Sequence, residues 1–158
     1  MQRILFSVAV VLLGSGVAFS QGVEQRHPIK DRDSFEFTTL EREQPILDSF
    51  ARGLLLEGGR KGYILVYAGR ISCEGEAKRV IELIEEHMAD RHGLERGRIV
   101  GMNGGYRERT TYEMWSVPKG EAGPIPTPTV DPSEVKFLRP NNPRCKYLRT
   151  SRGRKRRS

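Results

Sequence analysis

Polar and charged side chains follow the strongly apolar run 63–68, and a second group follows the apolar run 98–102. If both runs are parallel strands of one sheet, their carboxyl ends meet at the edge where open α/β sheets bind ligands. The two groups would then form one site for a small polar ligand, or they would serve only as a helix cap and a solvated loop. The candidate ligand-binding residues are Arg70, Ser72, Glu76, Asn103, Tyr106 and Arg107.

Cys73 and Cys145 are the only cysteines in the chain. In an oxidising compartment they could form a disulfide, which would tie the C-terminal segment to the rest of the protein. Alternatively, both are free thiols. A free Cys73 near a helix N-terminus and near Arg70 would be stabilised as a thiolate and could act as a nucleophile. The sequence leaves both possibilities open.

The histidines and glycines do not form a recognisable cofactor motif. His87 and His92 are five residues apart, a spacing that we expect to place them on different faces of a helix, and no cysteine or carboxylate cluster joins them as a ligand set. Gly101, Gly104 and Gly105 are not followed by a helix, so they do not predict a phosphate-binding loop. We therefore expect no metal and no cofactor.

Hydrophobic periodicity predicts strands that alternate with helices. The run 63–68 is apolar throughout, as in a central strand covered on both faces. Pro45 is expected to begin the first helix, and Ser72 is expected to cap the second. The order is β-α-β-α-β-β, a two-layer α/β sandwich of a small mixed sheet with two helices, and its folded part is expected to end at Pro118. The expected elements are strand 35–38, helix 45–57, strand 63–68, helix 74–91, strand 98–102, turn 103–105 and strand 110–117.

Several local patterns resemble the OmpA-like C-terminal domain, an envelope module whose best-known members bind peptidoglycan. Residues 47–54 look like that family's first helix, and Glu76-Ala77-Lys78-Arg79-Val80 is similar to its segment in which Arg-Ala precedes a Val. Residues 107–115 are similar to its closing strand. The resemblance covers about residues 35–118 and implies an OmpA-like fold. Residues 69–76 and 104–108 also resemble segments of small exported bacterial proteins.

Two ligand-binding positions differ from that family's pattern. Members that bind peptidoglycan hold its diaminopimelate group with an Asp just after the central strand and with the Arg of the helix motif. Here the strand runs into Ala68-Gly69-Arg70 without an Asp, and Glu76 stands at the position of that Arg. Because Glu76 reverses the charge offered to a carboxylate, the resemblance implies the fold and not the peptidoglycan pocket.

The N-terminal residues have the pattern of a cleaved secretory signal. Arg3 precedes an apolar run from Ile4 to Ala18, and small residues precede a cleavage site expected after Ser20. We therefore expect a periplasmic or secreted protein with no transmembrane segment after cleavage. The expected organisation is signal peptide 1–20, flexible leader 21–34, OmpA-like domain 35–118, Pro-rich linker 119–135 and basic tail 136–158.

Positive charge is concentrated at the C-terminal end. Residues 136–158 contain ten Lys or Arg and no Asp or Glu, whereas residues 21–135 have a net charge of about −4. We expect 140–158 to be disordered in isolation, because it has few apolar residues. An exported tail of this kind meets anionic lipid, lipopolysaccharide or a cell-wall polymer rather than nucleic acid, unless it serves only to keep the protein soluble. Its candidate contacts are Arg152, Arg154, Lys155, Arg156 and Arg157.

Together these features predict a non-catalytic binding or scaffold module of the bacterial envelope, with an unidentified ligand. The alternative is a small exported thiol enzyme or redox protein that uses Cys73 with Arg70 and Glu76. A purely structural exported domain is the third possibility.

Overall fold

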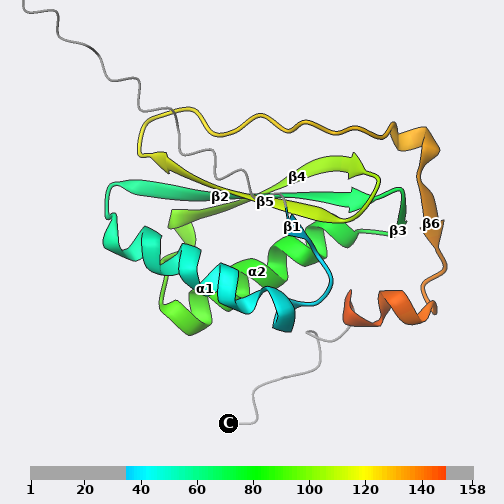
Figure 1. Ribbon diagram of the computed structural model, residues 1–158, viewed down its shortest axis with the longest axis horizontal. Coiled ribbons are helices and arrows are strands. Elements are labelled where there is room, and N and C mark those ends of the chain that lie inside the picture. The colour runs from blue at the N-terminus through cyan, green and yellow to red at the C-terminus, as the bar shows by residue number, and fades with distance from the viewer. Residues whose placement is uncertain (1–34, 149–158) are drawn as a thin grey trace, which may run out of the picture.

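The protein is described by a computed structural model for residues 35–148. The predicted signal peptide, the leader and the end of the basic tail, with its five candidate contacts, lie outside these residues. The described part contains a four-stranded mixed sheet with two helices on one face (Figure 1). This confirms the predicted two-layer α/β class and its core order, β-α-β-α-β-β, to which two short strands are added. No described helix is long and apolar enough to cross a membrane.

The sheet has the spatial order β1-β5-β2-β4. β2 pairs in parallel with β4, as expected for two strands joined through a helix, and it pairs antiparallel with β5. β1 pairs antiparallel with the other side of β5. The bounds are β1 Phe35–Glu36, α1 Leu40–Leu56, β2 Arg60–Gly69, α2 Glu76–His92, β4 Ile99–Arg107 and β5 Thr111–Pro118, with a 3-10 turn, η1, at Arg96–Arg98.

The central strand β2 is buried on both faces. Ile64, Val66 and Ala68 belong to the core beneath α1 and α2. Leu65 and Tyr67, which alternate with them, are also completely buried but lie on the opposite face of the sheet. Burial of each large apolar side chain stabilises the fold by roughly 1.5–3 kcal/mol, so this second apolar face requires a cover of its own.

That cover is the Pro-rich segment 119–135, here called the strap, which runs across the sheet on the side away from the helices (Figure 1). The backbone N–H of Lys119 donates to the carbonyl of Gly59 at 2.8 Å, and that of Thr127 donates to the Tyr67 hydroxyl at 3.1 Å. Val130 is buried and forms a bridge with Tyr106. The expectation that the folded part ends at Pro118 is therefore wrong, because the second face of β2 binds the chain that follows.

The chain then adds a small second sheet and a disulfide. β6 (Lys136–Leu138) pairs in parallel with β3 (Ile71–Cys73), and two 3-10 helices, η2 (Pro132–Glu134) and η3 (Pro143–Leu148), flank β6. Cys145 in η3 forms a disulfide with Cys73, their Cα atoms 5.8 Å apart. The expectation of disorder from residue 140 is therefore wrong as far as residue 148. Pairing with β3 and the covalent bond hold a segment that has little apolar surface of its own.

Both helices begin at residues other than those predicted. α1 begins at Leu40 rather than at Pro45, and its first turn is held by Glu43, whose buried carboxylate accepts a hydrogen bond from the Tyr112 hydroxyl at 2.9 Å. Burial, followed by this hydrogen bond, raises the pKa of Tyr112 above its usual value. α2 begins at Glu76, after Gly75 with φ +72° at the N-cap. Ser72 therefore belongs to β3 and does not cap the helix.

β4 also continues beyond its predicted end at residue 102, because the expected turn 103–105 is a bulge within the strand. Val66 pairs with Asn103 and Tyr67 pairs with Gly105, so Gly104 is the extra residue. A Cβ at Gly104 would lie 2.5 Å from Cε1 of the Tyr67 ring. The bulge thus makes room for a buried aromatic ring that only glycine can accommodate at this distance.

We predict that Gly104→Ala lowers the free energy of unfolding by about 1–3 kcal/mol, because the added methyl group collides with a buried ring. Urea unfolding of the oxidised protein measures the change. The matched control is Gly97→Ala, where no atom lies within 4 Å of the added carbon. A loss at Gly104 no larger than at Gly97 would contradict this packing argument.

Candidate functional site

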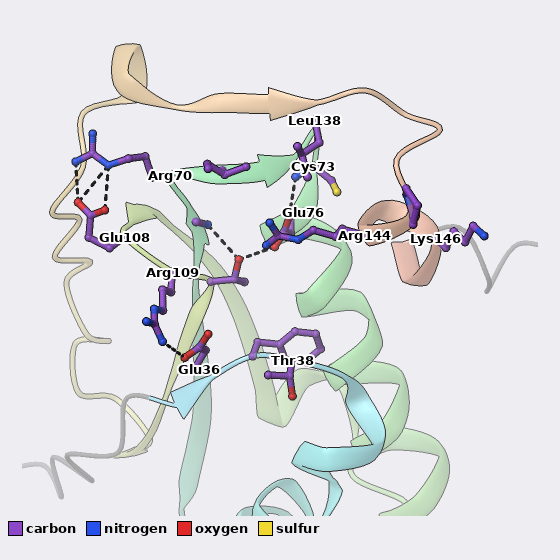
Figure 2. A pocket seen from close by; sticks show the side chains of 15 residues that line it. Glu36, Thr38, Arg70, Cys73, Glu76, Glu108, Arg109, Leu138, Arg144 and Lys146 are labelled. Atoms are coloured by element: carbon purple, nitrogen blue, oxygen red, sulfur yellow. Dashed lines mark hydrogen bonds and ion pairs between the residues drawn. The ribbon is translucent and has the colours of Figure 1, made fainter.

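A cleft of about 750 Å³ opens at the carboxyl end of β2 (Figure 2). Its walls come from β1, from the β2–β3 connection, from the start of α2, from the loop between β4 and β5, and from the end of β6 and η3. Residues distant in sequence therefore meet where open α/β sheets commonly bind ligands. The lining residues with charged side chains are Glu36, Arg70, Glu76, Glu108, Arg109, Arg144 and Lys146.

Glu76 lies deep in the cleft, at the first position of α2, and only 6% of its surface is exposed. Its carboxylate accepts a hydrogen bond from the backbone N–H of Cys73 at 2.7 Å and from the hydroxyl of Thr110 at 2.5 Å. The Thr110 oxygen accepts in turn from the N–H of Gly69 at 3.1 Å. The start of a helix favours a negative charge, so these contacts hold a buried carboxylate without a cationic partner among the described residues.

Arg70 stands at the rim and is fully engaged by carboxylates. It forms ion pairs with Glu108 at 2.7 Å and with Glu134 of the strap at 3.1 Å. Hydrogen bonds from Arg70 hold the pKa of Glu108 below its usual value, and those to Glu108 and Glu134 raise the pKa of Arg70. Arg70 therefore joins the strap to the β4–β5 loop rather than offering a free cation to a ligand.

Of the three other cations that line the cleft, one is paired with a carboxylate and two are not. Arg109 pairs with Glu36 at 2.9 Å, both side chains being well exposed. Arg144, which extends from η3 into the cleft on the side of Glu76 (Figure 2), and Lys146 have no ion-pair partner among residues 35–148. All three carboxylates that line the cleft are bonded to neighbouring protein groups. The lining therefore retains two cations that are free to meet an anion.

The other predicted ligand-binding residues do not join this cleft. Ser72 is buried, and its hydroxyl has no hydrogen-bond partner among the described residues. Asn103 and Tyr106 line a separate pocket of about 60 Å³, which Glu76 also borders. Arg107 pairs with Glu113 at 2.6 Å and lies over the Tyr67 ring, 3.5 Å from its centroid. Of the six candidates, only Arg70 and Glu76 face the large cleft.

The disulfide positions the cations that sequence reasoning missed. Cys73 and Cys145 are both buried, and the bond fixes η3, with Arg144 and Lys146 on either side of Cys145, against the end of β3. In this state Cys73 carries no thiol. The signal for this arrangement in the sequence is the presence of two cysteines, but the residue types alone do not decide whether they form a disulfide.

A second cluster lies at the far end of α2. The Nε2 atoms of His87 and His92 lie 2.8 and 2.7 Å from the same oxygen, Oδ1 of Asp48 on α1. The expectation that a spacing of five keeps the two rings apart is wrong, because His92 is the last residue of the helix and both rings turn toward the neighbouring helix. Hydrogen bonds from His92 and then from His87 lower the pKa of Asp48 to about 2.

No protein-family model matches the chain. The resemblance to OmpA-like domains therefore remains an expectation drawn from local sequence patterns. What the cleft binds has to be argued from its own charges and contacts.

We predict that Asp48→Asn destabilises the protein near neutral pH, and that its deficit shrinks in acid. The lowered pKa of Asp48 means that the carboxylate contributes stability above about pH 4, and that this contribution is lost as the pH falls toward 2. Urea unfolding between pH 2 and 7 tests this. A metal chelator is included so that no bound ion contributes to the measured stability. The control is Asp90→Asn, which removes an exposed carboxylate from α2, the helix that carries the two histidines. A deficit that is constant with pH would contradict the prediction.

Proposed function

We propose that the protein is an exported, non-catalytic binding module of the cell envelope, and that its cleft and the basic segment that follows bind an anionic envelope component. The observation that carries this proposal is the unequal pairing of charges in the cleft. Glu36, Glu76 and Glu108 are each bonded to the protein. Arg144 and Lys146 have no such partner in the described part of the chain. Four cations and three carboxylates line the cleft, a net charge of +1, and Arg144 and Lys146 are the two cations that can form an ion pair with a ligand without breaking one within residues 35–148.

The sequence after the cleft strengthens this charge. Six further Lys or Arg follow Lys146 before the end of the chain. The disulfide at Cys145 fixes the point from which this segment departs, beside the cleft. A lipid headgroup, lipopolysaccharide or an anionic cell-wall polymer is large enough to contact the cleft and the segment together, and each basic residue near such a surface contributes about 1 kcal/mol.

A non-catalytic role is supported by the contacts of the potentially reactive groups in the cleft, which bond to one another. The Thr110 hydroxyl and the Glu76 carboxylate bond to each other, and Cys73 is part of the disulfide. The charges also differ from those expected for the diaminopimelate pocket of peptidoglycan-binding OmpA-like domains. At the matching positions this chain has Arg70, which is paired with carboxylates, and Glu76, which would repel a ligand carboxylate.

The first test is binding of the mature chain, residues 21–158, to candidate materials. Vesicles of phosphatidylglycerol, lipopolysaccharide and isolated cell walls are compared with neutral phosphatidylcholine vesicles by co-sedimentation at increasing salt. We predict binding to at least one anionic material, progressive loss with salt and no binding to the neutral vesicles. Absence of binding to all three anionic materials would refute the proposal.

The second test compares two charge-matched double variants. Arg144→Gln with Lys146→Gln removes the unpaired cations of the cleft, and we predict that it weakens binding by about 2 kcal/mol, or roughly 25-fold. Arg52→Gln with Lys119→Gln removes the same charge from exposed positions outside the cleft and should have a much smaller effect. Equal losses in the two variants would assign the binding to net charge alone. Deletion of 149–158, which retains the disulfide, measures the contribution of the segment beyond the cleft.

Export is tested separately, on the protein recovered from its native cells. We predict that N-terminal sequencing finds Gln21 as the first residue and that the protein fractionates with the periplasm or the medium. Recovery from the cytoplasm with residues 1–20 intact would refute the proposed export and, with it, the proposed role in the cell envelope.

A further inference from the structure

The cluster formed by Asp48, His87 and His92 lies at the end of α2 opposite the cleft, since Glu76 begins this helix and His92 ends it. The three side chains are largely buried, with exposures of 15, 6 and 13%. Asp48 comes from α1, so the cluster joins the two helices that cover one face of the sheet (Figure 1). The proposed binding function uses none of these residues.

Two features distinguish this cluster from an ordinary pair of surface histidines. Both rings direct the same atom, Nε2, toward one carboxylate oxygen, at 2.8 and 2.7 Å. One atom from each of the three residues can be chosen so that all three lie within 4.8 Å of one another. Two imidazole nitrogens and a carboxylate oxygen form a donor set that suits zinc and related divalent ions, and catalytic zinc sites also use three protein ligands.

We propose that His87, His92 and Asp48 form a binding site for a divalent transition-metal ion of the zinc type, which joins α1 to α2. The ion would be bound by Nε2 of each histidine and by Oδ1 of Asp48, with solvent in the remaining position. Bonds to zinc of about 2.0–2.1 Å place tetrahedral ligands roughly 3.3 Å apart. Each histidine therefore has to withdraw from the carboxylate oxygen by about 0.5 Å, and the two imidazole nitrogens have to reach the same spacing from each other, through rotation of the side chains.

Arg91 is the group that opposes the ion. Its Nε lies 3.5 Å from the other carboxylate oxygen, Oδ2 of Asp48, and its side chain is 57% exposed. A guanidinium at this distance repels a cation and competes for the carboxylate. Because Arg91 contacts Oδ2 and the histidines contact Oδ1, the ion and Arg91 occupy different sides of the carboxylate. Removal of Arg91 should therefore strengthen metal binding.

The test is titration of the mature, disulfide-bonded protein with zinc chloride after removal of bound metal with a chelator. Without reductant, the cysteines offer no thiol that could bind zinc. We expect one ion per chain by isothermal titration calorimetry and a higher unfolding temperature with zinc than without. Cobalt(II) added in place of zinc should give the visible absorption of a tetrahedral site, which reports the ligands directly.

Variants assign the ligands. His87→Gln and His92→Gln should each weaken zinc binding at least roughly tenfold, since even the loss of an outer-shell partner costs that much. His27→Gln removes the one other histidine of the chain and should leave binding unchanged. Arg91→Gln should bind zinc more tightly than the wild type, a gain that damage to the fold would not produce. Unfolding curves without metal identify any variant that fails to fold.

Three results would overturn the proposal. These are no zinc binding by the wild-type protein, affinity unchanged in both His87→Gln and His92→Gln, or an equal loss in His27→Gln. Any of them would leave the cluster as a hydrogen-bonded contact between the two helices. The binding test of the cleft does not depend on this outcome, because the two sites share no residue.

Discussion

Much of this structure depends on the absence of a polar face on the central strand. Along β2, Ile64 and Val66 pack beneath the helices, while Leu65 and Tyr67 are equally buried on the other side. Two helices cover one face only. The strap supplies the second cover, and its path across the sheet carries the following residues to β3, where β6 pairs and Cys145 meets Cys73. One wall of the cleft at the end of β2 is therefore formed by residues that the strap, which covers the core, brings to that place.

The elements predicted correctly are those whose apolar residues repeat with a clear period. The continuous run 63–68 indicated a strand buried on both sides, and the stripe of α2 indicated a helix between parallel strands. The strap has no such period, because its burial is set by the shape and apolar character of a distant strand. The prediction of a turn at residues 103–105 is wrong for a similar reason. A glycine is needed at position 104 because of the Tyr67 ring, which is distant in sequence, and not because of the neighbouring residues.

The sites show the same division between local and distant causes. Arg70 and Glu76 could be placed together because both follow one strand, and the rule that ligands meet strand ends applies to them directly. Arg144 lies more than sixty residues further along the chain, and only the disulfide, which the sequence left undecided, brings it there. The expectation for the histidines rests on the geometry of a single helix. Their common partner, Asp48, is on another helix, and no spacing rule within α2 could reveal it.

The Cys73–Cys145 bond also turns most of the domain into a covalent ring. The ring contains α2, β4, β5, the strap and β6, whereas α1 and β2 precede it. A protease that cut one peptide bond in the exposed stretch around Ile125 would open the ring without releasing a fragment, because the sulfur bridge still joins the two products. The cationic end of the chain would stay attached to the nicked protein until a second cut or a reductant freed it, so its retention depends on redox conditions as well as on proteolysis.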